Sequence, residues 1–461
     1  MIKNITLIIL FFALSLKLVA QDSTFQNIDS KSYQLYLDKD WSELIKVSKK
    51  AIQNGEDYYY LRMRLGIAYY EQKKYNLSYT QFLEAKKFDN NDLLNEYLYY
   101  SYYFAGNYAE AEQLSNNFND ELKQKLDIEN KNKRNYFSSF YGGFINSSYD
   151  KLYSIRENKT SIFTLNNRFR NKYNQVFGAN IKFKLNPNYT TSIAYNKLLE
   201  PKTQIIQNNI SIEEISNNTS QSNLYFNLVY SSLKFNWFIG VNFITVQDNY
   251  IEIEEIIPDL KKKEIDIKYT NSLFSTGFIY NTPYISIGLN TSFSNLNSNR
   301  QFQLGTGLYI YPKANKNIII YAEPYFQNIS GSMVIENSKS NRTQYEYKSI
   351  AQNTVVKLGL KTKIYRNTYI EFMGYFGKLN QFNENVGYYV YNDIDPINLM
   401  LKTKLDMRLS KKLSFFVSYT YSEKEHKYET INYFFPPTVV VEKISINITN
   451  QNIIGGFTWH F

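Results

Sequence analysis

The chain changes its hydrophobic period once, near residue 136. From about residue 30 to residue 118, apolar residues recur at the three- and four-residue spacing of amphipathic helices. From Tyr136 onward they alternate with polar residues at period two, as in strands with one apolar and one polar face. Leu358 and Leu360, for example, alternate with Lys357, Gly359 and Lys361. The pattern predicts separate α and β domains, with the helices first and the strands after them.

A short, mostly apolar segment precedes the helical region. Lys3 is followed by a mostly apolar run of twelve residues from Ile5 to Leu16, and the small residue Ala20 stands just before Gln21. A basic start, a short apolar core and a small residue at the cut are typical of a secretory signal peptide. The apolar run is too short to span about 30 Å of hydrocarbon as a helix. We therefore predict a signal peptide at residues 1–20 and export of the mature chain.

The helical region repeats itself. Trp41 and Tyr75 are 34 residues apart, and Tyr75 and Tyr108 are 33 apart. The residues that carry the pattern are Trp41, Leu65, Gly66, Tyr69, Tyr75, Phe82, Ala85, Tyr108 and Ala111. They resemble tetratricopeptide repeats, whose period is 34 residues.

The resemblance implies closely packed helix pairs, with the glycine at the point of closest approach, and a concave surface that binds peptides or proteins. The alternative is an unrelated bundle of helical hairpins. In either case we predict a periplasmic helical domain with its linker at residues 21–135.

Turn residues divide the strand region unequally. Short turns are predicted at residues 186–188, 231–232, 281–283, 312–317, 366–367 and 410–412, and longer polar stretches, interpreted as loops, at 200–220, 247–266, 327–349 and 423–450. Short turns on one side and long loops on the other are typical of an outer-membrane β-barrel. The spacing predicts about 14 antiparallel strands, within a range of 12 to 16, over residues 136–461. The barrel must close, because an open sheet edge in lipid leaves backbone groups unpaired.

The C-terminal strand carries the sharpest local signal. Ile453, Gly455, Phe457, Trp459 and Phe461 fall on one face of a strand that ends the chain. This pattern resembles the signal by which the outer-membrane assembly machinery recognises barrels, and the resemblance gives that role to Phe457, Trp459 and Phe461. A soluble β-sandwich can also end on an aromatic strand. It would not account for the signal peptide or for the unequal turns.

Composition agrees with a barrel and argues against an enzyme. The 44 tyrosines and 32 phenylalanines suit a lipid-facing surface with aromatic girdles. The mean hydropathy of -0.44 is too low for several membrane helices. With no cysteine and two histidines, thiolate chemistry and histidine-rich metal sites are excluded, and we predict no cofactor and no enzyme. His426, predicted in a long external loop, leaves a surface hydrolase as a minor alternative.

The positive charge lies in the strand region. Residues 136–461 hold 34 Lys and Arg against 24 Asp and Glu, a balance equal to the net charge of +10 for the whole chain. Lysines that alternate with apolar residues should point into the lumen, because a lysine facing mid-membrane lipid costs about 2–4 kcal/mol. The predicted luminal bases are Lys182, Lys184, Lys357, Lys361, Lys363, Lys402, Lys404 and Arg408. Glu323, Glu371 and Asp406 are the predicted inward acids.

Two main functions follow. One is an outer-membrane pore or export channel with a basic lumen for anionic or polar solutes, whose helical repeats dock a periplasmic partner. The other is a non-conducting barrel that anchors a periplasmic scaffold. The order of repeats and barrel resembles that of exopolysaccharide-export porins, which have more repeats and a longer barrel. The predicted partners are membrane lipid, lipopolysaccharide and the assembly machinery, and nucleic acid is not expected because the charge forms no single patch.

Overall fold

The computed structural model describes residues 25–128, 136–147, 163–171, 173–207, 212–255, 261–336, 343–392, 396–434 and 438–461. The predicted signal peptide at residues 1–20 lies outside the described residues, as does part of the predicted linker. The chain forms two compact units, one of helices and one of strands.

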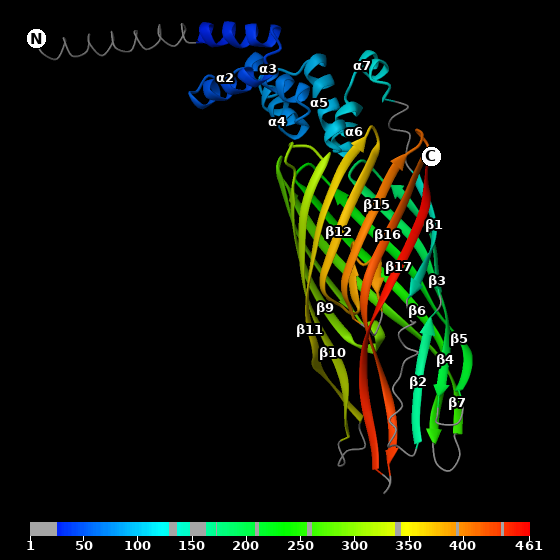
Figure 1. Ribbon diagram of the computed structural model, residues 1–461. Coiled ribbons are helices and arrows are strands. Elements are labelled where there is room, and N and C mark those ends of the chain that lie inside the picture. Colours follow the sequence, from blue (N-terminus) through cyan, green and yellow to red (C-terminus); the bar gives the residue numbers. More distant parts are fainter. Residues whose placement is uncertain are drawn as a thin grey trace, which may run out of the picture. The chain divides into compact units, whose positions relative to one another are not determined.

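The N-terminal unit consists of seven helices within the described residues (Figure 1). The first spans residues 25–37. The others are α2 (Trp41–Gln53), α3 (Tyr59–Glu71), α4 (Tyr75–Ala85), α5 (Asp92–Ala105), α6 (Tyr108–Asn116) and α7 (Asp120–Lys125). None of these helices is long and apolar enough to cross a membrane.

Helices α3 and α4 pack closely at Gly66. A Cβ atom added to Gly66 would lie 2.5 Å from the ring of Phe82. Ser78 donates its hydroxyl to the carbonyl oxygen of Gly66 at 2.9 Å, so the close approach also satisfies a buried polar group. This is the role that the sequence predicts for the glycine. The structure shows helical hairpins here, and their assignment to the tetratricopeptide class stays a prediction.

Most of the predicted packing residues of this unit are in its core. Leu65, Gly66, Tyr69, Phe82, Ala85 and Ala111 are buried, and Trp41 and Tyr75 are half-buried. Tyr108 differs, because it is 62% exposed and its ring lies edge-on against Tyr103. As the first residue of α6 it projects outward, so the prediction that Tyr108 packs inside is wrong.

The contact between Gly66 and Phe82 leads to a prediction about the stability of the helical unit. Gly66→Ala should lower the free energy of unfolding of the helical unit by about 1–3 kcal/mol, because the new methyl group overlaps the Phe82 ring. Loss of the helical circular-dichroism signal on heating the full-length protein measures this change. Adding Phe82→Leu should recover part of the loss, and an unchanged melting curve for Gly66→Ala would contradict the packing account.

The second unit is a closed antiparallel barrel of fourteen strands in the described chain (Figure 1). These strands are β1 (Tyr136–Ser147), β3 (Tyr173–Lys184), β4 (Tyr189–Gln207), β5 (Ile212–Ser231), β6 (Phe235–Glu255), β7 (Lys261–Asn281), β8 (Ile285–Ser294), β9 (Arg300–Ile310), β10 (Ile318–Glu336), β11 (Thr343–Tyr365), β12 (Thr368–Leu379), β15 (Ile397–Arg408), β16 (Leu413–Phe434) and β17 (Thr438–His460). The barrel closes where β1 pairs with β17, with Phe140 opposite Phe457. The strand β2 (Phe163–Asn171) also pairs with β4 and β16. The predicted fold class is confirmed.

The two faces of the barrel wall divide as the alternation predicts. Leu358, Leu360 and Ile364 are 46%, 40% and 55% exposed, as expected for apolar side chains that face lipid. In the C-terminal strand Phe457 and Trp459 are 51% and 43% exposed on the same outer face. The aromatic face of the last strand therefore lies outside, and its role in assembly stays a prediction.

All six predicted short turns join neighbouring strands, but the four predicted long loops are largely strand. β4 and β5, β6 and β7, β10 and β11, and β16 and β17 continue as paired hairpins through most of the polar stretches. His426 accordingly lies in β16 opposite Ile446 and not in a loop. The loop prediction was wrong because backbone pairing continues where the side chains lose their apolar alternation.

Candidate functional site

A segment between β12 and β15 folds into the barrel lumen. Residues 380–392, here called the plug, contain the two-stranded ribbon of β13 (Phe382–Glu384) and β14 (Tyr389–Tyr391). Phe382, Asn383 and Glu384 are 0%, 3% and 4% exposed. A polar loop on the outside of a barrel would be solvated, so this burial shows that the plug is part of the interior.

Hydrogen bonds from the wall hold the backbone of the plug. Gln303 of β9 donates its amide to the carbonyl oxygen of Asn383 at 2.7 Å, and Asn242 of β6 donates to that of Gly387 at 2.8 Å. Gln327 of β10 donates to the carbonyl oxygen of Asn380 at 2.8 Å. Because these inward side chains satisfy buried carbonyl groups, they fix the plug at one height in the lumen.

The plug also contacts further wall strands. Ser275 of β7 and Tyr225 of β5 donate their hydroxyls to the carbonyl oxygen of Val386. The ring of Tyr388 lies edge-on against that of Tyr225, with centroids 5.2 Å apart, and its hydroxyl donates to that of Tyr141 of β1 at 3.4 Å. The plug therefore reaches across the lumen from β9 and β10 to β1.

The backbone conformation of the plug is unusual, and it fits the contacts that the plug makes with the wall. Asn385, Val386 and Gly387 all have positive φ, at 52°, 61° and 79°. A positive φ is costly for a β-branched residue such as Val386, and it persists only where the surroundings enforce it. At Gly240 of β6 a Cβ atom would overlap the Val386 carbonyl oxygen, so this glycine makes room for the turn.

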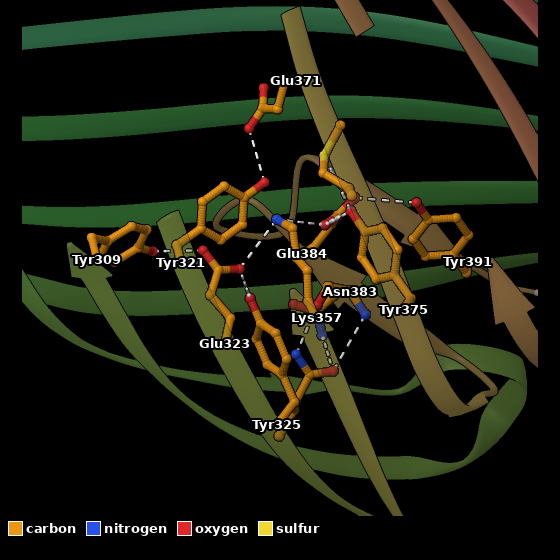
Figure 2. Close-up of polar contacts among 12 residues, drawn as sticks. Tyr309, Tyr321, Glu323, Tyr325, Lys357, Glu371, Tyr375, Asn383, Glu384 and Tyr391 are labelled. Atoms are coloured by element: carbon orange, nitrogen blue, oxygen red, sulfur yellow. Dashed lines mark hydrogen bonds and ion pairs between the residues drawn. The ribbon is translucent and has the colours of Figure 1, made fainter. Parts of the chain in front are cut away.

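An ionic network joins the plug to one side of the wall (Figure 2). The Lys357 ammonium of β11 lies 3.1 Å from Oε2 of Glu323 of β10 and 3.2 Å from Oε2 of Glu384 of the plug. Tyrosine hydroxyls also donate hydrogen bonds to both carboxylates. Tyr325 and Tyr309 donate to Glu323 at 2.8 and 2.6 Å, and Tyr375 and Tyr391 donate to Glu384 at 2.7 and 3.1 Å.

Each charged group of this network depends on its partners, because it is largely removed from water. A buried carboxylate is tolerated when it is paired and hydrogen-bonded, and removing one partner of such a pair typically costs about 3–5 kcal/mol. The apolar surroundings of the network are formed by the buried cluster of Val355, Met373, Leu379, Phe382, Ile397 and Met400. Lys357 therefore fastens the plug to the wall rather than lining an open passage.

The other predicted luminal bases differ in their partners. Lys361 and Lys404 have acidic neighbours, Glu371 at 3.9 Å and Asp406 at 2.8 Å. Arg408 donates to the carbonyl oxygens of its own turn, Ser410 at 3.2 Å and Lys411 at 2.9 Å.

Lys182, Lys363 and Lys402 make no ion pair within the described residues. The ammonium of Lys402 lies 4.9 Å from the ring centroid of Tyr389 in the plug, and that of Lys363 lies 5.9 Å from the ring centroid of Tyr369. Lys182 and Lys184 alternate with the exposed residues Ile181 and Leu185, which places both lysines on the inner face of β3.

The plug and Glu384 were not found by sequence reasoning. The segment offers only single apolar residues such as Phe382 among polar ones, and the four residues Tyr388 to Tyr391, which are too few for a period to be read. Within the described residues no three acidic or histidine side chains are grouped so that they could hold a metal ion. His460 lies on the inner face, with Nε2 2.9 Å from the Ser414 hydroxyl.

Comparison with known proteins gives similarity in fold only. No protein-family profile matches the sequence, and no curated protein matches it. Among solved structures, a FadL homologue from Pseudomonas aeruginosa is 7% identical, with 71% of this chain and 90% of that chain covered and a TM-score of 0.41.

Two toluene transporters give similar values. TodX of Pseudomonas putida is 7% identical with a TM-score of 0.44, and TbuX of Ralstonia pickettii is 9% identical with a TM-score of 0.42. Each covers 71% of this chain and 90% of its own. At such identities and TM-scores the likenesses say nothing about a solute.

Proposed function

We propose that the protein is an outer-membrane channel for small anionic solutes, with the plug as its closure. The observation that carries the proposal is the combination of a plug inside the lumen with inward lysines that form no ion pair within the described residues. Of these, Lys402 still lies within electrostatic reach of Glu384 of the plug. Lys182, Lys363 and Lys402 come from β3, β11 and β15, so positive charge lies on more than one side of the lumen.

The electrostatic argument is that a narrow, low-dielectric channel concentrates the field of its lining charges. Lysines that line such a channel raise the local concentration of anions and repel cations. Charges with close counterions, such as Lys361 and Lys404, contribute less because their field is largely cancelled. The selectivity should therefore depend chiefly on Lys182 and Lys363, and on Lys402 once Glu384 has left with the plug.

The second candidate is a non-conducting barrel that anchors the helical unit. The tight hydrogen bonding of the plug favours it, since a segment fastened by so many wall groups can be a permanent part of the interior. In this account the helical unit docks a periplasmic protein and the lumen has no transport role. The two functions differ in whether loosening the plug produces a current.

A small change in the wall tests closure without altering any charge. Gly240→Ala should raise single-channel open probability in planar bilayers by about tenfold, because the added methyl group overlaps the Val386 carbonyl oxygen and weakens the seat. Gly288→Ala is the matched control. A Cβ atom added to Gly288 would have its nearest neighbour at 3.4 Å, which is an ordinary van der Waals contact. Equal, negligible currents for both variants would favour the anchor.

A further inference from the structure

The wall side of the Glu384 contact has the composition of a carboxylate-binding site. Lys357 and Tyr375 converge on one oxygen of Glu384, at 3.2 and 2.7 Å. The Lys357 side chain is 13% exposed, so the contact is largely removed from bulk water. Charge-assisted hydrogen bonds of this kind are about twice as strong as neutral ones.

The two sides of this contact belong to different parts of the chain. Lys357 and Tyr375 lie on the wall strands β11 and β12, whereas Glu384 lies on the plug, together with Tyr391, which donates to its other oxygen. The wall donors would therefore stay in place when the plug leaves. They would then face the lumen with Glu323 as the nearest acid, bonded to Tyr325 and Tyr309.

We propose that Lys357 and Tyr375 form a binding site for a small carboxylate solute, which Glu384 occupies while the plug is seated. This inference rests on the channel function proposed above and names the solute class. A carboxylate that enters the lumen competes with Glu384 for the same two donors. Its binding releases the plug, so the solute opens its own passage.

The charges around Lys357 favour this competition. When Glu384 is seated, Lys357 lies between two carboxylates and its charge is more than balanced. When Glu384 leaves, Lys357 retains one carboxylate, and Lys402 of β15 adds a second positive charge on the wall. The vacated position therefore attracts an anion, and the paired donors favour one with a carboxylate oxygen.

A cysteine reporter under the plug tests this proposal directly. The protein has no cysteine, and Ser292 of β8 is 4% exposed and accepts a hydrogen bond at 2.9 Å from the Asn383 amide of the plug. In full-length Ser292→Cys protein, the labelling rate with a water-soluble maleimide reports release of the plug. Acetate is the probe, with acetamide and chloride at equal ionic strength as controls.

Acetate should raise the labelling rate about tenfold, whereas acetamide and chloride should leave it unchanged. Glu384→Gln should label rapidly without acetate, since the plug has lost its charged group. Lys357→Gln should remove the acetate response. Because that variant leaves buried carboxylates unbalanced, Tyr375→Phe is the second test, and it should weaken the response while the barrel still shows heat-modifiable migration.

Equal labelling rates with acetate, acetamide and chloride would overturn the proposal, as would slow labelling of Glu384→Gln. Either result leaves the proposed channel function intact if ion currents with anion preference are observed. If the labelling rate depends on acetate but neither wild type nor Gly240→Ala carries a current, the proposed channel function is contradicted. The proposed carboxylate site is then still supported.

Discussion

Replacing the plug with a short turn should convert a closed barrel into an open one. Leu379 at the end of β12 pairs directly with Ile397 at the start of β15, so a tight turn can join the strands in place of residues 380–395, which contain the plug. We expect single-channel conductance in planar bilayers to rise about tenfold or more, because the segment that crosses the lumen is gone. The barrel itself should still assemble, since the strand pairing that closes it is unchanged.

The control for this prediction is a change inside the plug that preserves its seat. Asn385 is exposed and has a φ of 52°, which glycine adopts easily, so Asn385→Gly should leave the channel closed. Heat-modifiable migration checks that both variants are folded. A plug-less barrel that folds and carries no more current than wild type would contradict the assignment of residues 380–392 as the closure.

Reversing the charge of two luminal lysines should reverse the ion preference of the open barrel. In the plug-less background, Lys182→Glu with Lys363→Glu should lower the permeability ratio of chloride to potassium about tenfold. These two lysines lie on opposite flanks of the charged wall, on β3 and β11, and neither forms an ion pair within the described chain. The reversal potential in a potassium chloride gradient measures the ratio.

The same charge change elsewhere should have little effect. Lys49 and Lys50 are exposed on α2 of the helical unit, so Lys49→Glu with Lys50→Glu alters the net charge equally without changing a residue of the barrel wall. If both double variants shift the reversal potential alike, selectivity does not arise from the luminal lysines.

The barrel was predictable because its signals are local. Period-two alternation around residues such as Leu358 and Leu360 fixes which side chains face lipid, and clustered turn residues mark where strands reverse. The C-terminal face with Phe457 and Trp459 is outside for the same reason. A close approach of helices at Gly66 was expected from the resemblance to tetratricopeptide repeats, and the structure identifies Phe82 as the contact.

The plug could not be predicted, because its position depends on contacts between distant parts of the chain. Gln303 and Asn383, which bond to each other, are 80 residues apart, and β13 and β14 have only three residues each. The ion pair of Lys357 with Glu384 depends on the same inward fold. Sequence reasoning placed Lys357 in the lumen but gave no means of finding the acid that faces it.

The far ends of the long hairpins were missed for a different reason. Once a strand leaves the hydrocarbon, nothing requires one face to be apolar, and the alternation fades while the backbone pairing continues. The pairing of Glu200 with Thr219 and of His426 with Ile446 belongs to this region. Polar composition alone therefore predicts a loop where the structure has a strand.

The sign of the reversal potential in a potassium chloride gradient is the most direct test of an anion-preferring channel closed by the plug. For single plug-less barrels with all luminal lysines intact, we predict a reversal potential shifted from zero toward the equilibrium potential of chloride. Wild-type barrels in the same bilayers should pass rare, brief currents of the same sign. A reversal potential shifted toward the equilibrium potential of potassium, measured on folded plug-less protein, would contradict the account.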